Sequence, residues 1–172
     1  MRRSIAAAAV TAALALATGC GRRAWGGSGG AEPQLPLLAE TLAGERFVVG
    51  GPGPVRLVEL WATWCTPCGP AAERARTVLA RHPNVVAYAV SIDQDRAELT
   101  RRLVEAPPPG TALVLTGGPT AAARAGIPQV PTFLALDARG RLVGTVVGLS
   151  SGLGPALEKL LRRAEGRMGD PE

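Results

Sequence analysis

Two cysteines separated by two residues lie in the segment Trp64-Cys65-Thr66-Pro67-Cys68. A thiolate can attack the disulfide of a partner, and a second thiol within bonding reach must then release the mixed disulfide. At the start of a helix this spacing brings two thiols into reach, and the helix dipole and unpaired N–H groups favour the thiolate of the first. We therefore expect Cys65 to be the nucleophile and Cys68, one turn deeper and facing the core, to be the resolving thiol.

The flanking sequence predicts a strand before the cysteines and a helix after them. Residues 55–61 form a short, largely apolar run that follows the breakers Gly50-Gly51-Pro52-Gly53-Pro54. Residues 71–80 are rich in Ala, Arg, Glu and Leu, which favour helix, and the pattern ends at residues 81–84. Pro67 and Pro70 fall near the first turn of this helix, where a missing N–H costs little.

Two structural roles for the cysteine pair are the alternatives. A structural zinc site needs about four Cys or His ligands, whereas the chain offers only Cys65, Cys68, His82 and the distant Cys20. A purely structural disulfide that closes so short a loop would constrain the unfolded chain little. Both alternatives are weaker than a redox role, and we expect neither a metal nor another cofactor besides the redox-active disulfide.

A second segment, Gly126-Ile127-Pro128-Gln129-Val130-Pro131-Thr132-Phe133, follows later in the chain. Together with residues 61–68 it resembles the thioredoxin superfamily, and in detail the membrane-anchored TlpA-like disulfide reductases related to ResA and the cytochrome c maturation thioredoxins. The resemblance implies a cis peptide bond at Pro131, which would lie against the active-site disulfide. It also implies that the backbone of Val130 pairs with a substrate strand. The implied substrate-binding residues are Trp64, Thr66, Pro67, Val130 and Pro131.

Glu59 lies inside the apolar strand, six positions before Cys65. A carboxylate is costly there unless it has a partner or a task. Thioredoxin carries a buried aspartate at the matching position, and the resemblance implies that Glu59 exchanges a proton with Cys68, with a pKa raised by burial. The alternative is that strand alternation turns Glu59 outward, against Arg56.

The first residues resemble an export signal. A positive start, Met1-Arg2-Arg3, precedes an apolar stretch over residues 5–17 that is long enough for a signal peptide but short for a membrane span. Ala17-Thr18-Gly19-Cys20 resembles the lipobox of bacterial lipoproteins, although Leu16 stands one place too early. We expect residues 1–19 to be a lipoprotein signal, Cys20 to be lipidated and residues 20–34 to be a flexible tether. Ordinary cleavage and retention as an uncleaved anchor remain the alternatives.

Cysteine count and charge are consistent with this interpretation. Three cysteines are an odd number for an exported protein, and assigning Cys20 to a lipid leaves one complete pair. The net charge of the precursor is +5, and Arg2 and Arg3 are the only charges before Cys20, so loss of the signal leaves +3. The other arginines are interspersed with acids and lack interleaved aromatic residues, which disfavours nucleic-acid binding. We expect a monomer in the bacterial cell envelope, lipid-anchored and facing the periplasm or extracytoplasmic space.

The rest of the chain alternates strand and helix patterns, which predicts an α/β fold. We expect residues 35–165 to form one thioredoxin-like domain, a three-layer sandwich with a central mixed sheet, an N-terminal extension and a TlpA-type insertion, followed by a tail at 166–172. The predicted strands are residues 85–92, 111–115, 132–136 and 141–147, the last two forming a hairpin. The predicted helices are residues 93–105, 119–125 and 153–163.

The expected activity is thiol-disulfide exchange on exported proteins. Thr66 and Pro67 offer little to stabilise a reduced pair, which favours a disulfide reductase over an oxidase or isomerase. By resemblance, the electron donor would be a membrane protein of the DsbD or CcdA kind, and clients include apocytochromes c. A peroxiredoxin-like peroxidase would need a Thr three positions before its cysteine, and a Sco-like copper carrier would need a wider cysteine spacing. Both are weaker alternatives.

Overall fold

The computed structural model describes residues 35–105, 113–124 and 126–166. The predicted signal, Cys20, the tether and all of the predicted tail except Gly166 lie outside the described residues. The strands in the described ranges are β1 (Leu37–Thr41), β2 (Arg46–Val49), β3 (Arg56–Trp61), β4 (Val86–Ser91), β5 (Leu113–Thr116), β6 (Thr132–Leu136) and β7 (Leu142–Val147). The helices are α1 (Cys68–Leu79), α2 (Arg96–Glu105), α3 (Gly118–Arg124) and α4 (Leu153–Gly166).

The strands form a single mixed sheet in the order β2-β1-β5-β4-β3-β6-β7. Strand β3 lies inside the sheet, pairing in parallel with β4 and antiparallel with β6. The parallel order β3, β4, β5 places the carboxyl ends of these strands at one edge of the sheet. The cysteine segment follows β3 directly, so it emerges at that edge beside the residues that follow β4.

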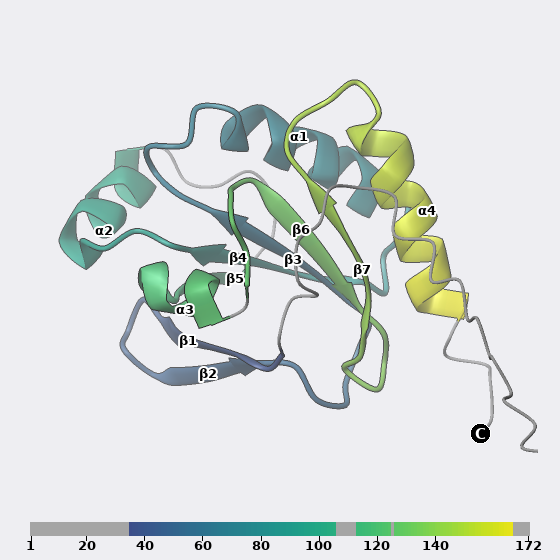
Figure 1. The fold of residues 1–172 in the computed structure, drawn as a ribbon, viewed down its shortest axis with the longest axis horizontal. Coiled ribbons are helices and arrows are strands. Elements are labelled where there is room, and N and C mark those ends of the chain that lie inside the picture. The colour runs from purple at the N-terminus through teal and green to yellow at the C-terminus, as the bar shows by residue number, and fades with distance from the viewer. Residues whose placement is uncertain (1–34, 106–112, 125, 167–172) are drawn as a thin grey trace, which may run out of the picture.

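Helices cover both faces of the sheet, which gives the three layers expected from the sequence (Figure 1). On one face, α1 and α4 pack over a core that includes Leu57, Phe133, Leu157 and Leu161. On the other face, a second core includes residues of α3, of β1 and β2, and the β3 residues Val58 and Leu60. The α/β class and the central mixed sheet are therefore as predicted.

The N-terminal extension is a β-hairpin that the strand assignments from sequence do not include. Strands β1 and β2 pair antiparallel, and β1 also pairs antiparallel with β5. Along β1, buried Leu37 and Ala39 alternate with exposed Leu38 and Glu40, as in a strand with one covered face. Gly44, with a φ of 92°, makes the turn between the two strands.

Helices α1 and α2 both begin at a different residue from the one predicted. Helix α1 begins at Cys68 instead of residue 71, because Pro67 already has helical angles at the N-cap. Helix α2 begins at Arg96 instead of residue 93, since the side chain of Asp95 accepts the N–H groups of Ala97 and Glu98 at 2.8 and 3.1 Å. Asp93 therefore lies before α2 and not in it.

Candidate functional site

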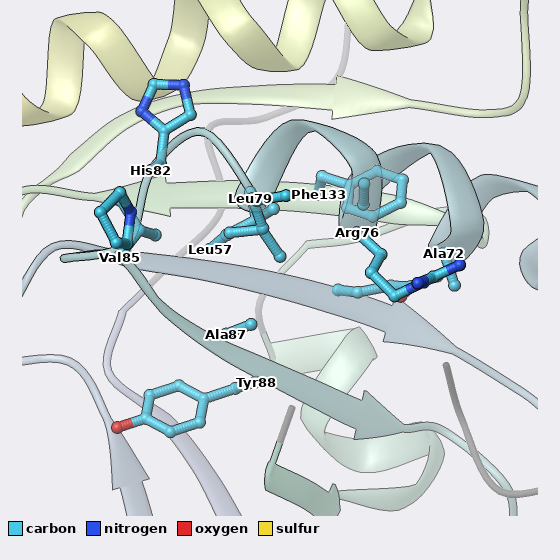
Figure 2. A pocket seen from close by; sticks show the side chains of 13 residues that line it. Leu57, Ala72, Arg76, Leu79, His82, Val85, Ala87, Tyr88 and Phe133 are labelled. Atoms are coloured by element: carbon cyan, nitrogen blue, oxygen red, sulfur yellow. The ribbon is translucent and has the colours of Figure 1, made fainter. Parts of the chain in front are cut away.

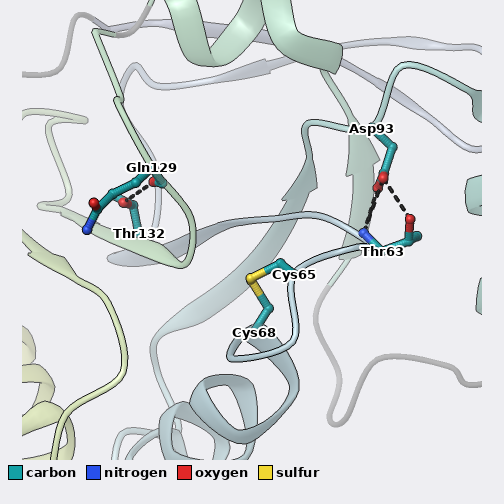
Figure 3. The surroundings of a disulfide bond; sticks show 6 residues. All are labelled: Thr63, Cys65, Cys68, Asp93, Gln129 and Thr132. Carbon is teal, nitrogen blue, oxygen red and sulfur yellow. Dashed lines mark hydrogen bonds between the residues drawn. A yellow bond between two sulfur atoms is a disulfide. The ribbon is translucent and has the colours of Figure 1, made fainter.

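Cys65 and Cys68 are joined by a disulfide in the turn between β3 and α1, with their Cα atoms 5.4 Å apart (Figure 3). The turn is held by two backbone hydrogen bonds: the Cys65 N–H donates to the Ala62 carbonyl, and the Cys68 N–H donates to the Cys65 carbonyl, both at 3.1 Å. Cys68 is the first residue of α1, and Cys65 precedes the N-cap. As the spacing predicts, the two cysteines are within bonding reach of each other at the start of a helix.

The two cysteines differ in solvent exposure. Cys65 retains 9% of its accessible surface and Cys68 only 3%. Cys65 is therefore the more accessible of the two cysteines, and Cys68 is the more deeply buried. The first turn of α1 contains no acidic residue, so the positive end of the helix dipole acts on the cysteine segment without an opposing carboxylate on that turn.

The loop before β6 lies next to the disulfide. The Val130–Pro131 peptide bond is cis, and Val130 packs against a cluster formed by Ala62, Cys65 and Cys68. The Thr132 hydroxyl donates to the Gln129 carbonyl at 2.7 Å across this loop (Figure 3). The two segments that carry the resemblance thus meet in space.

The residues predicted to contact substrate surround the disulfide on two loops. Trp64 is 68% exposed, and Thr66 and Pro67 are also exposed. Val130 is half-buried and Pro131 is buried. The exposed Trp64, Thr66 and Pro67 and the half-buried Val130 therefore lie around the disulfide.

Glu59 faces the layer that contains α1. Its neighbour two residues earlier, Leu57, belongs to the core under α1 and α4, whereas Val58 and Leu60 belong to the opposite core. The alternative in which Glu59 turns out to meet Arg56 does not occur, because the Arg56 guanidinium donates to the carbonyls of Gly51 and Pro52 at 2.8 and 3.2 Å.

Glu59 lines a cavity of about 400 Å³ beside α1. Figure 2 shows this cavity, with Leu57, Arg76 and Phe133 among the labelled lining residues. Ala72, Ala75, Arg76 and Leu79 line it from the helix, and Leu57, Ala87 and Phe133 are among the residues that line it from the sheet. The Oε1 atom of Glu59 is buried and has no hydrogen-bond partner among the described residues. Burial raises the pKa of Glu59 from 4.5 to about 8.

Asp93 is a polar residue of the site that the sequence analysis assigns only to a helix. It stands two residues after the end of β4, and its carboxylate accepts hydrogen bonds from the backbone N–H and the hydroxyl of Thr63, two residues before Cys65 (Figure 3). The available signal was an aspartate placed just after a buried strand that runs parallel to β3. Carboxyl ends of neighbouring parallel strands meet at one edge, where sites form.

The described residues contain no group of three or more His, Cys, Asp or Glu side chains placed to hold a metal ion. Among the helices in the described ranges, none combines the length and the apolar character needed to cross a bilayer.

Comparison with known proteins identifies similar structures only. No protein-family model matches the sequence, and no curated protein matches it. The solved structure of dsbF from MTB is 24% identical, with a TM-score of 0.62, covering 78% of this chain and 100% of that chain.

Two further solved structures have comparable likeness. A Chlorobium tepidum structure, titled as a thiol:disulfide interchange protein DsbE, is 19% identical with a TM-score of 0.64, covering 79% of this chain and 97% of its own. The exposed lipoprotein thioredoxin of Streptococcus pneumoniae is 18% identical with a TM-score of 0.59, covering 74% of this chain and 99% of its own. Together with the sheet order and the two helical layers, these likenesses show that the chain has a thioredoxin-like fold.

Proposed function

We propose that the protein is a thiol-disulfide oxidoreductase that reduces disulfides of exported proteins. The observation that carries the proposal is the Cys65–Cys68 disulfide, which packs beside Val130 of the cis-Pro131 loop and in which Cys65 is the more exposed residue. The names of similar structures support it, since they include a thiol:disulfide interchange protein and a lipoprotein thioredoxin.

The first chemical step is attack by the Cys65 thiolate on the substrate disulfide. A bond forms between Cys65 Sγ and one substrate sulfur, the substrate S–S bond breaks, and the departing substrate thiolate takes up a proton from water. The position of Cys65 just before the start of α1 favours its thiolate form. Val130 and the exposed Trp64 would hold the substrate strand beside the sulfur.

The second step releases the reduced substrate. Cys68 loses its proton to ionised Glu59 and attacks Cys65 Sγ, which re-forms the Cys65–Cys68 bond and expels the second substrate thiolate. When a donor dithiol later reduces the pair, Cys68 leaves as a thiolate, and neutral Glu59 can return the proton. A carboxyl with a pKa of about 8 is neutral in most molecules at pH 7, which suits this recharging step.

We also propose a cellular setting for this activity. Lipidation at Cys20 would hold the domain at a membrane face in the bacterial envelope, near a DsbD- or CcdA-like donor of electrons. Clients would be exported thiol proteins, with apocytochromes c as one class, as the TlpA-like resemblance implies. Palmitate labelling that disappears in Cys20→Ala would support the anchor, and an unlabelled wild type would contradict it.

A trapping experiment tests the assignment of the two cysteines. Cys68→Ser should accumulate a mixed disulfide between Cys65 and a disulfide-bearing client peptide, whereas Cys65→Ser should accumulate much less. Mass spectrometry of the adducts after acid quenching measures both. Equal trapping by the two variants, or trapping by neither, would contradict the proposed roles.

A further inference from the structure

Asp93 is a buried carboxylate near the disulfide that accepts hydrogen bonds from both Thr63 and Ser91. It retains 9% of its surface, and its two carboxylate oxygens accept the Thr63 N–H at 3.0 and 3.2 Å and the Thr63 hydroxyl at 2.7 Å. The Ser91 hydroxyl donates to the same carboxylate at 2.7 Å, and the Asp93 N–H donates back to the Ser91 oxygen at 3.0 Å. A buried carboxylate is costly without such donors, so this set stabilises one geometry.

The Asp93 bonds hold the segment that leads into Cys65. Thr63 stands two residues before Cys65, and Ala62 accepts the Cys65 N–H and packs against both cysteines. Ile92, the neighbour of Asp93, packs against the same cluster, and its N–H donates to the Trp61 carbonyl at 2.9 Å. The turn before Cys65 is therefore tied to the end of β4 through side chain and backbone (Figure 3).

The two cysteines differ in what fixes them. Cys68 belongs to α1, so the helix itself determines its position. Cys65 lies before the N-cap, in a turn that also contains Thr63, and Asp93 holds Thr63 by hydrogen bonds. If the bonds to Thr63 are lost, Cys65 gains freedom relative to Cys68.

We propose that Asp93 is a positioning residue that sets the dithiol–disulfide equilibrium of the Cys65/Cys68 pair by holding the turn before Cys65. This inference rests on the proposed function. In the reduced protein, a fixed turn keeps the Cys65 sulfur within reach of Cys68, which raises the effective concentration of one thiol at the other. A looser turn lowers that concentration, so the disulfide becomes less favoured.

The measured reaction is protein dithiol plus oxidised glutathione giving protein disulfide plus two reduced glutathione molecules, so electrons and protons balance. Asp93→Ala removes every acceptor from Thr63, and we expect the equilibrium constant of this reaction to fall about tenfold. Asp93→Asn keeps one acceptor oxygen, and Thr63→Val removes only the hydroxyl donor. We expect an intermediate decrease of about threefold for each.

Asp95→Ala is the matched control, because Asp95 stands two residues away and, among the described residues, its side chain accepts only the N–H groups of Ala97 and Glu98 at the start of α2. It should lower thermal stability and leave the equilibrium constant within twofold of wild type. Thermal unfolding of every variant, oxidised and reduced, separates loss of stability from the redox effect.

The outcomes distinguish this inference from the proposed function. A wild type that reaches no reversible equilibrium with glutathione would defeat both. A reversible wild type together with unchanged constants in folded Asp93→Asn and Thr63→Val would overturn the role of Asp93 alone. If Asp93→Ala does not fold, the Asn and Val variants decide the question.

Discussion

Glu59 on β3 lies directly opposite Ala89 on the parallel strand β4. The residue beside Glu59 on β4 therefore carries only a methyl group as its side chain. The same face continues from Leu57 opposite Ala87, which is also small. The cavity beside α1 lies over these positions and includes Glu59, Leu57 and Ala87. The small side chains on β4 thus leave space beside the Glu59 carboxyl, while the buried Phe133 stands opposite Glu59 on β6.

Replacing Glu59 with Gln should slow proton transfer with Cys68. The amide keeps the shape of the side chain but cannot accept or return the proton, so resolution of a mixed disulfide should slow about tenfold or more. The wild-type rate should rise with pH toward about 8, where Glu59 becomes ionised, whereas the rate of the variant should stay lower and rise only as the Cys68 thiol ionises without a base. Stopped-flow measurement of mixed-disulfide release from pH 6 to pH 9 provides both values.

Glu45→Gln is a suitable control because Glu45 is exposed in the β1–β2 hairpin, away from the cysteine turn. Its rates should match wild type. A Glu59→Gln protein with wild-type rates at every pH would remove Glu59 from the mechanism.

The raised pKa of Glu59 also predicts a pH-dependent free energy of unfolding. The unfolded carboxyl ionises near 4.5 and the folded one near 8, so folding becomes less favourable as pH rises through this window. Glu59→Gln removes the penalty and should be more stable than wild type by about 4 kcal/mol at pH 7.5, since that pH lies about three units above the unfolded pKa, with the difference vanishing below pH 4.5. Urea unfolding of the oxidised proteins at pH 4 and pH 7.5 tests this, and a constant difference would contradict it.

A charge cluster joins α4 to the end of α1. The Arg81 guanidinium donates a hydrogen bond to the Glu158 carboxylate at 2.9 Å. Arg162 also donates to this carboxylate, and the His82 ring lies close to it. Arg81 above all, with Arg162 and His82, lowers the pKa of Glu158 to about 2. Because the folded pKa lies below the unfolded value of 4.5, this stabilisation is present above 4.5 and is lost as pH falls toward 2.

Glu158→Gln should therefore lower the melting temperature at pH 7, and the gap to wild type should close as pH falls from 4.5 to 2. Glu73→Gln is the control, since Glu73 pairs with Arg76 within α1 and does not join two helices. Thermal unfolding at pH 7, 4 and 2 measures the effect. A gap that stays the same at pH 2 would show that the carboxylate charge is not responsible.

The cysteine turn and its flanking elements were predictable because local signals agree there. The apolar run before Cys65, the helix formers after Cys68 and the prolines between all favour the observed strand–turn–helix order. The hairpin at residues 132–147 was also predictable, since Gly140 stands in a four-residue turn between two apolar runs, with a φ of 78°.

The parts that sequence reasoning missed depend on contacts distant in the chain. Strand β1 is short and mixes apolar with polar residues, and its pairing with β5 joins segments about 75 residues apart, as for Glu40 and Thr116. Asp93 and Thr63 are separated by 30 residues, so their hydrogen bonds follow only from the parallel pairing of β3 and β4. The orientation of Glu59 likewise required knowing that both faces of β3 are covered.

The redox potential of the Cys65/Cys68 pair, measured by equilibration of the wild-type domain with a glutathione series, tests the central claim most directly. A reductase requires a potential more negative than that of glutathione, roughly −220 mV or lower, and this is the result that the account predicts. A potential near that of a strong oxidant, about −120 mV, would reverse the direction of electron flow, and the absence of reversible exchange would contradict the account altogether.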